Sequence, residues 1–116
     1  MNPAPQFIQG VFSFEGRGFD SPLPLNPLAA YKVPRDKRAQ PIYVRGGNSS
    51  DQLIVLLLLR DGKVMRYFPI GARSDMHVSL AVVEDIFPET ELEIQLAAPK
   101  GATGVAIVDF GVYELD

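Results

Sequence analysis

Short apolar runs separated by turn residues recur along the chain, and this pattern predicts strands rather than helices. No window of a dozen residues keeps the i, i+3, i+4 spacing of a helix without Pro or Gly, apart from a stretch near Leu80–Ile86. We therefore expect about eight strands. They are Phe7–Phe14, Ala29–Val33, Pro41–Arg45, Gln52–Leu59, Lys63–Ile70, Met76–Val83, Glu91–Ala97 and Gly104–Leu115.

The predicted strands differ in whether one of their two faces is polar. Glu91–Ala97 alternates between apolar and polar residues, so one face is expected to be wet. Leu53–Leu59 is an unbroken apolar run, and Gly104–Leu115 carries only Asp109 and Glu114 as charged residues. Strands with two apolar faces are typical of a sheet that is covered on both sides. The outer faces of these two strands therefore need a cover.

The Pro-rich segment Ser21–Leu28 is one candidate for that cover. It has prolines at 22, 24 and 27 and leucines at 23, 25 and 28, so it is apolar and extended but unsuited to a helix or a central strand. This composition predicts an extended strap that lies over an outer sheet face. The alternative cover is another copy of the protein.

Turn residues and chain length indicate the fold class. In Arg60-Asp61-Gly62-Lys63 the Asp-Gly pair supplies the positive φ angles of a tight hairpin turn. A chain of 116 residues suits one domain with its own core. We therefore predict a single all-β domain over residues 1–116, with residues 1–5 flexible. The expected architecture is a two-sheet antiparallel β-sandwich of jelly-roll or Greek-key type.

Charge is divided unevenly along the chain. Residues 1–74 hold ten Lys and Arg against five Asp and Glu, a net charge of +5, whereas residues 75–116 hold one against nine, a net charge of −8. One interpretation is that the two parts lie side by side in one domain and neutralise each other, each exposed pair contributing at most about 1 kcal/mol. The other is contact between subunits of a homo-oligomer.

Composition also limits the partners and the compartment. The longest apolar run is far shorter than the roughly 20 residues of a membrane-spanning helix, so no membrane contact is expected. The start of the chain lacks a secretory signal and there is no cysteine, which favours a cytoplasmic protein. The basic segment Tyr31–Arg38 has an aromatic neighbour, but the acidic net charge makes nucleic acid an unlikely partner.

Few residues suit catalysis or metal binding. His77 is the only histidine and cysteine is absent, which excludes the usual zinc sites within one chain. The remaining metal hypothesis is a structural calcium on the loop residues Asp20, Asp51 and Asp75. His77 is expected at a strand start without a chemical role, and the carboxylates of residues 84–93 are typical of a solvated surface. We therefore expect no catalytic residue, no metal and no cofactor.

Two features suit ligand binding instead. The segment Arg45–Asp51 is predicted to be a polar loop between two strands, able to bind sugar hydroxyls or an anion. Asp109 lies inside an apolar strand, where a carboxylate needs a partner. It is expected either to pair with a strand arginine or to face a ligand together with one. The candidate ligand-binding residues are Arg45, Asn48, Asp51, Tyr43, Arg66 and Asp109.

These observations predict a non-catalytic interaction module that self-associates or docks on a partner protein. The doubly apolar strands and the oppositely charged parts of the chain favour this function. In architecture the chain resembles small β-sandwich modules that bind carbohydrate or join subunits. The alternative function is therefore binding of a carbohydrate or another small ligand, as in a lectin. A carboxylate-dependent enzyme is a third and weaker hypothesis.

Overall fold

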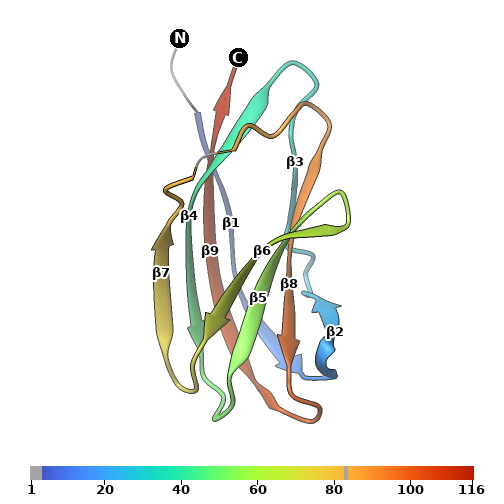
Figure 1. Cartoon of the computed structure of the whole chain (residues 1–116), viewed down its shortest axis with the longest axis vertical. Coiled ribbons are helices and arrows are strands. Elements are labelled where there is room, and N and C mark those ends of the chain that lie inside the picture. The colour runs from blue at the N-terminus through green and yellow to red at the C-terminus, as the bar shows by residue number, and fades with distance from the viewer. Residues whose placement is uncertain (1–3, 83) are drawn as a thin grey trace.

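Two antiparallel sheets pack face to face in the computed structural model (Figure 1), which describes residues 4–82 and 84–116. Sheet A has the order β1-β9-β4-β7, and sheet B has the order β2-β8-β5-β6 with β3 beside β8. Within the described residues the strands are β1 (Ala4–Glu15), β2 (Gly18–Pro24), β3 (Ala30–Lys32), β4 (Arg38–Asn48), β5 (Ile54–Arg60), β6 (Lys63–Ile70), β7 (Asp75–Ser79), β8 (Glu91–Ala98) and β9 (Thr103–Leu115). The predicted all-β sandwich is confirmed.

The strand pairing has the nested order of a jelly roll. Strand β1 pairs with β9, β2 and β3 pair with β8, β4 pairs with β7, and β5 pairs with β6. The additional pairs β4·β9 and β5·β8 join these ribbons into the two sheets. The chain thus crosses repeatedly between the layers, so residues distant in sequence become neighbours on one face.

The core lies between the sheets and follows the period of two that a strand imposes. Phe110 on β9, Val44 on β4 and Leu56 and Leu58 on β5 point inward and are fully buried. Along each of these strands, the residues next to the inward-pointing ones point outward. This alternation decides that Asp109 faces away from the core, on the outer face of sheet A.

The predicted hairpin between β5 and β6 is confirmed. Arg60 and Lys63 are opposite each other, and the two residues between them, Asp61 and Gly62, have φ angles of 49° and 81°. A two-residue loop with two positive φ angles matches the right-handed twist of the flanking strands.

The Pro-rich segment takes a different place from the predicted strap. Ser21–Pro24 belong to β2, an additional strand at the edge of sheet B that pairs with β8. Leu25 follows it and enters the core. An edge position tolerates proline because one side of the strand has no ladder to complete. The segment therefore extends sheet B sideways instead of covering the outer face of β5.

The outer face of β5 is covered by its own sheet. Leu57 and Leu59 are only 3% and 7% exposed in the single chain, and they cluster with Ala97 and Val55. The cross-strand neighbours of Leu57 are Gln95 on β8 and Tyr67 on β6. Burial of the apolar run thus needs neither a strap nor a second copy, because side chains on both flanking strands shield it.

Several predicted boundaries are corrected by the structure. Strand β4 continues to Asn48, so the predicted loop Arg45–Asp51 is mostly strand. The predicted strand Met76–Val83 corresponds to β7, which already ends at Ser79, and residue 83 lies outside the described residues. Ala4 and Pro5, expected in a flexible segment, pair with β9, whereas residues 1–3 also lie outside the described part.

No helix long and apolar enough to cross a bilayer occurs in the part of the chain described.

Ion pairs confirm that the two oppositely charged parts of the chain neutralise each other within one molecule. Each pair found among the described residues joins a cation from residues 1–74 to an anion from residues 75–116. They are Arg35–Glu89, Lys37–Asp116, Arg38–Asp85 and Arg66–Glu84. Because these side chains are partly or largely exposed, each pair adds little to the stability of the fold.

Candidate functional site

A row of four polar side chains crosses the outer face of sheet A. Register places Gln9 opposite Asp109, Asp109 opposite Arg45, and Arg45 opposite His77. The row therefore runs over β1, β9, β4 and β7 at a single level. We call these four residues the polar row. They come from distant parts of the chain, and only the jelly-roll pairing brings them together.

Asp109 is held by hydrogen bonds from two neighbours. The Gln9 amide Nε2 donates to Asp109 Oδ1 at 3.1 Å, and the Tyr43 hydroxyl donates to the same oxygen at 2.8 Å. The structure has these bonds in place of the predicted ion pair with an arginine. The Arg45 guanidinium carbon lies instead 5.5 Å from the centroid of the Tyr43 ring, a separation at which a cation and an aromatic ring attract each other.

Tyr43 connects the polar row to the aromatic residues beside it. Burial raises the pKa of its phenol, and the hydrogen bond to Asp109 and the negative charge of that carboxylate raise it further, against the opposing charge of Arg45. The Tyr43 hydroxyl therefore stays protonated at neutral pH and remains a donor to Asp109. The His77 ring meets the Tyr43 ring edge-on, with 6.1 Å between centroids.

Next to the polar row is a small depression in which the Tyr43 ring lies over a glycine. Gly111 has no side chain, and a Cβ atom there would overlap the Tyr43 ring. Phe7 and Tyr113, which are 55% and 41% exposed, line the same depression of about 130 Å³. We call the group Phe7, Tyr43, Gly111 and Tyr113 the aromatic hollow.

On its other side the polar row borders a second, wider depression. Its volume is about 500 Å³, and Arg45, Asp75, His77 and Asp109 supply its polar side chains while Ile107 supplies apolar surface. Along β4 and β9, the residues that line the aromatic hollow are two residues away from those that line the wider depression. Two residues of a strand span about 7 Å. The outer face of sheet A thus offers an aromatic and a polar depression that adjoin at Tyr43, Arg45 and Asp109.

The structure brings together three of the six predicted ligand-binding residues. Tyr43, Arg45 and Asp109 are adjacent, as described above. Asn48 is buried, and its amide group donates to the backbone oxygens of residues 52, 70 and 71, so it closes the loop after β4. Asp51 lines a separate depression beside the β8–β9 turn, and Arg66 on β6 pairs with Glu84.

Sequence reasoning missed the contributions of Gln9, His77, Phe7 and Gly111 to this face. The residue types alone carried no signal, because a glutamine and a phenylalanine in a strand are ordinary. Their relevance comes from the strand register.

Regarding metals, no group of three or more His, Cys, Asp or Glu side chains able to hold an ion is found in the described residues.

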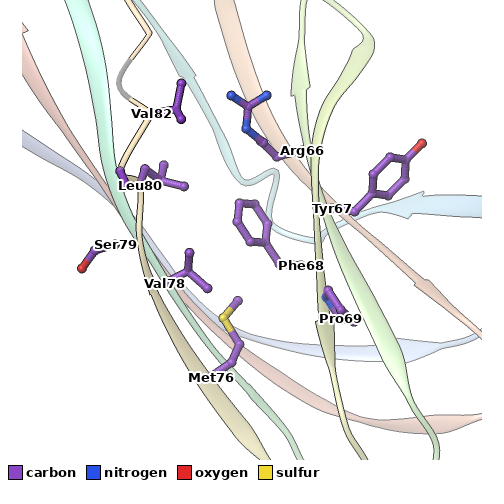
Figure 2. Close-up of a pocket in the computed structure, with 10 residues that line it drawn as sticks. Arg66, Tyr67, Phe68, Pro69, Met76, Val78, Ser79, Leu80 and Val82 are labelled. Carbon is purple, nitrogen blue, oxygen red and sulfur yellow. The ribbon is translucent and has the colours of Figure 1, made fainter.

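A further depression, of about 370 Å³, lies at the open edge of the sandwich between β6 and β7 (Figure 2). Figure 2 shows that Phe68, Met76 and Val78 point into it, whereas Tyr67 and Ser79 point away. Its lining is mainly apolar. It therefore lacks the convergent polar groups with which a binding site orients a ligand rich in hydroxyl groups.

The fold is a β-sandwich of two antiparallel sheets, and its likeness to a solved structure concerns that fold. The chain is similar to the CBM36-1 domain of a multidomain xylanase from the hindgut metagenome of Trinervitermes trinervoides, with a TM-score of 0.59 and 15% identity over 95% of this chain and 96% of that one. At this identity the likeness establishes the fold, that of a carbohydrate-binding module domain. It is the fold class that the sequence predicted.

A second solved structure has lower similarity. It is the insecticidal delta-endotoxin Cry8Ea1 from Bacillus thuringiensis, with a TM-score of 0.46 and 10% identity over 90% of this chain and 19% of that one. By sequence, no protein-family model and no curated protein matches the chain.

Proposed function

We propose that this protein is a non-catalytic module that binds an oligosaccharide on the outer face of sheet A. The observation that carries the proposal is the polar row, with Asp109 and Arg45 at its centre, directly beside the aromatic hollow. The likeness to a carbohydrate-binding module domain of a xylanase supports the same function. Among the functions considered from the sequence, this one replaces self-association as the first choice.

The chemistry of the two depressions matches the two kinds of surface on a sugar. A pyranose ring has an apolar C–H face, which packs on exposed aromatic side chains such as Phe7 and Tyr113. Its hydroxyl groups both donate and accept hydrogen bonds. Asp109 accepts only and Arg45 donates only, so together they are able to satisfy both roles of a hydroxyl pair. Neighbouring rings of one oligosaccharide would occupy the two depressions.

Calorimetric titration with xylohexaose tests the proposal, with cello- and manno-oligosaccharides of equal length as further probes. Saturable binding of at least one probe is expected. Arg45→Ala should weaken it about tenfold, the loss of roughly 1.4 kcal/mol that one charge-assisted hydrogen bond supplies. Arg35→Ala is the matched control, because Arg35 lies before the start of β4, its side chain is 91% exposed and it lines neither depression; it should leave the affinity unchanged.

Two outcomes would refute carbohydrate binding at this face. The first is the absence of saturable heat with every oligosaccharide at millimolar concentration. The second is binding that Arg45→Ala and Arg35→Ala weaken equally, since a site elsewhere, or a general loss of positive charge, would then explain the affinity. Circular dichroism of both variants establishes that they are folded.

A further inference from the structure

The outer edge of β1 is long, regular and uncharged. In the order β1-β9-β4-β7, β1 has a neighbouring strand on one side only among residues 4–82 and 84–116. It pairs with β9 over twelve residues without a bulge, and from Ala4 to Phe14 it contains no charged residue. Edge strands of monomeric proteins are commonly protected by charges, bulges or a short length. Apart from Pro5, β1 has none of these protections.

One hydrogen bond identifies which backbone groups are free on this edge. The Gly16 N–H donates to the Ala102 oxygen at 2.7 Å, so residue 16 faces β9. Because hydrogen-bonded and non-hydrogen-bonded positions alternate in an antiparallel pair, the even-numbered residues of β1 face β9 and the odd-numbered residues face the open edge. Pro5, which has no N–H to offer, is odd-numbered, the position expected of proline at an edge.

The side chains on the open edge are complementary to themselves. The odd-numbered positions also carry the side chains of the outer face, and Phe7 and Val11 are 55% and 67% exposed there. They are placed symmetrically about Gln9, two residues to either side. An antiparallel copy of β1 centred on Gln9 would therefore set each Phe7 opposite a Val11. Centring on Gly10 would instead set Phe7 opposite Ser13 and lose the apolar match.

We propose that two copies of this chain pair through β1, antiparallel, about a twofold axis at Gln9. Sheet A of the two subunits then becomes one continuous eight-stranded sheet. Backbone hydrogen bonds from Phe7, Gln9 and Val11 close the edge, and the paired Phe7 and Val11 side chains bury apolar surface. The two Asp109 residues lie three strand spacings apart, about 14 Å, on one face. Pairing through β1 does not depend on what that face binds.

Cysteine cross-linking tests the proposed register, because the chain has no cysteine of its own. Directly opposite residues in a hydrogen-bonded pair have Cα atoms about 5.5 Å apart, within the span of a disulfide. Gln9→Cys should therefore give a covalent dimer under mild oxidation. Ser13→Cys places the two thiols about 27 Å apart, eight residues along the ribbon, and should stay monomeric on a denaturing gel. Equal cross-linking of both variants, or of neither, would overturn the register.

Light scattering across a hundredfold concentration range tests the association itself. The native chain should change from monomer to dimer, and Val11→Lys should raise the dissociation constant at least tenfold by placing a charge against Phe7 of the partner subunit. Ile107→Lys is the matched control, since Ile107 lies opposite Val11 on β9, is 54% exposed and is not on the edge. A native chain that is monomeric throughout, or equal weakening by both substitutions, would contradict the proposal.

Discussion

The outer faces of sheets A and B both lie over apolar strands, yet one face is closed and the other is open. On sheet B, the central strand β5 carries Leu57 and Leu59, which are buried by side chains of the flanking strands. On sheet A, the corresponding positions of β9 are Asp109 and Gly111, and hollows form around them. A few residues in the middle of a sheet thus decide whether its outer face is filled or able to receive a ligand.

The physical difference is side-chain volume. Large aliphatic side chains on β5 meet their neighbours and leave little accessible surface, which is how apolar burial stabilises the sheet. On sheet A, the glycine at 111 is overlaid by the Tyr43 ring and the glycine at 47 adds no side chain, while Phe7, Ile107 and Tyr113 on the same face stay exposed. The exposed apolar and polar groups of sheet A are therefore available for binding, whereas the apolar groups of sheet B serve stability.

The largest expected effect is the loss of stability when the closed face is opened. Leu57→Ala should lower the free energy of unfolding by about 3 kcal/mol, the usual cost of removing a buried leucine side chain. Ile107→Ala on the open face should cost no more than about 0.5 kcal/mol, because that side chain is exposed. Urea unfolding of both variants provides the measurement. Equal costs would show that the two faces do not differ as described.

A smaller effect is expected when a methyl group is added to the open face. Gly111→Ala should destabilise the protein by about 2 kcal/mol, because the new Cβ displaces the Tyr43 ring from a well-packed position. The near-ultraviolet circular dichroism of tyrosine should change with it. Gly47→Ala is the matched control: its Cβ would lie 3.6 Å from Ile107, an ordinary contact, so little change is expected. Normal stability of Gly111→Ala would mean that the Tyr43 ring moves freely.

The smallest effect concerns the hydrogen bond between Tyr43 and Asp109. Tyr43→Phe should cost about 1 kcal/mol at neutral pH, the net value of one hydrogen bond. The pKa of Tyr43 is raised in the folded protein, chiefly by burial. The contribution of the Tyr43 hydroxyl to the free energy of unfolding is therefore complete below the unfolded pKa of about 10. It is lost as the pH rises through the higher pKa of the folded protein.

The decline in stability at alkaline pH should accordingly be less steep in Tyr43→Phe than in the native chain. Thermal unfolding between pH 8 and 11 measures this. Tyr67→Phe, which removes an exposed hydroxyl on the outer face of sheet B, serves as the comparison. A Tyr43→Phe curve parallel to the native one throughout would contradict a role for this phenol in the alkaline decline.

Parts of the candidate site were predictable because they depend on local chemistry. Asp109 was conspicuous as a carboxylate in an apolar strand, and Tyr43 and Arg45 were singled out next to a polar segment. Gln9 and His77 were not, because their relevance depends on standing opposite Asp109 and Arg45. Asn48 was predicted to bind a ligand but closes a loop, since the sequence does not show which donors the backbone needs.

The sequence by itself determined eight of the strands, the Asp61-Gly62 hairpin and the sandwich class, because alternation of side chains and positive φ angles are properties of neighbouring residues. Only the tertiary structure decided that β2 extends sheet B, that β5 is covered by its own sheet, and that the polar row forms. These features depend on register between strands that are up to a hundred residues apart. A shift of one residue would turn every side chain to the opposite face, and no local pattern encodes that choice.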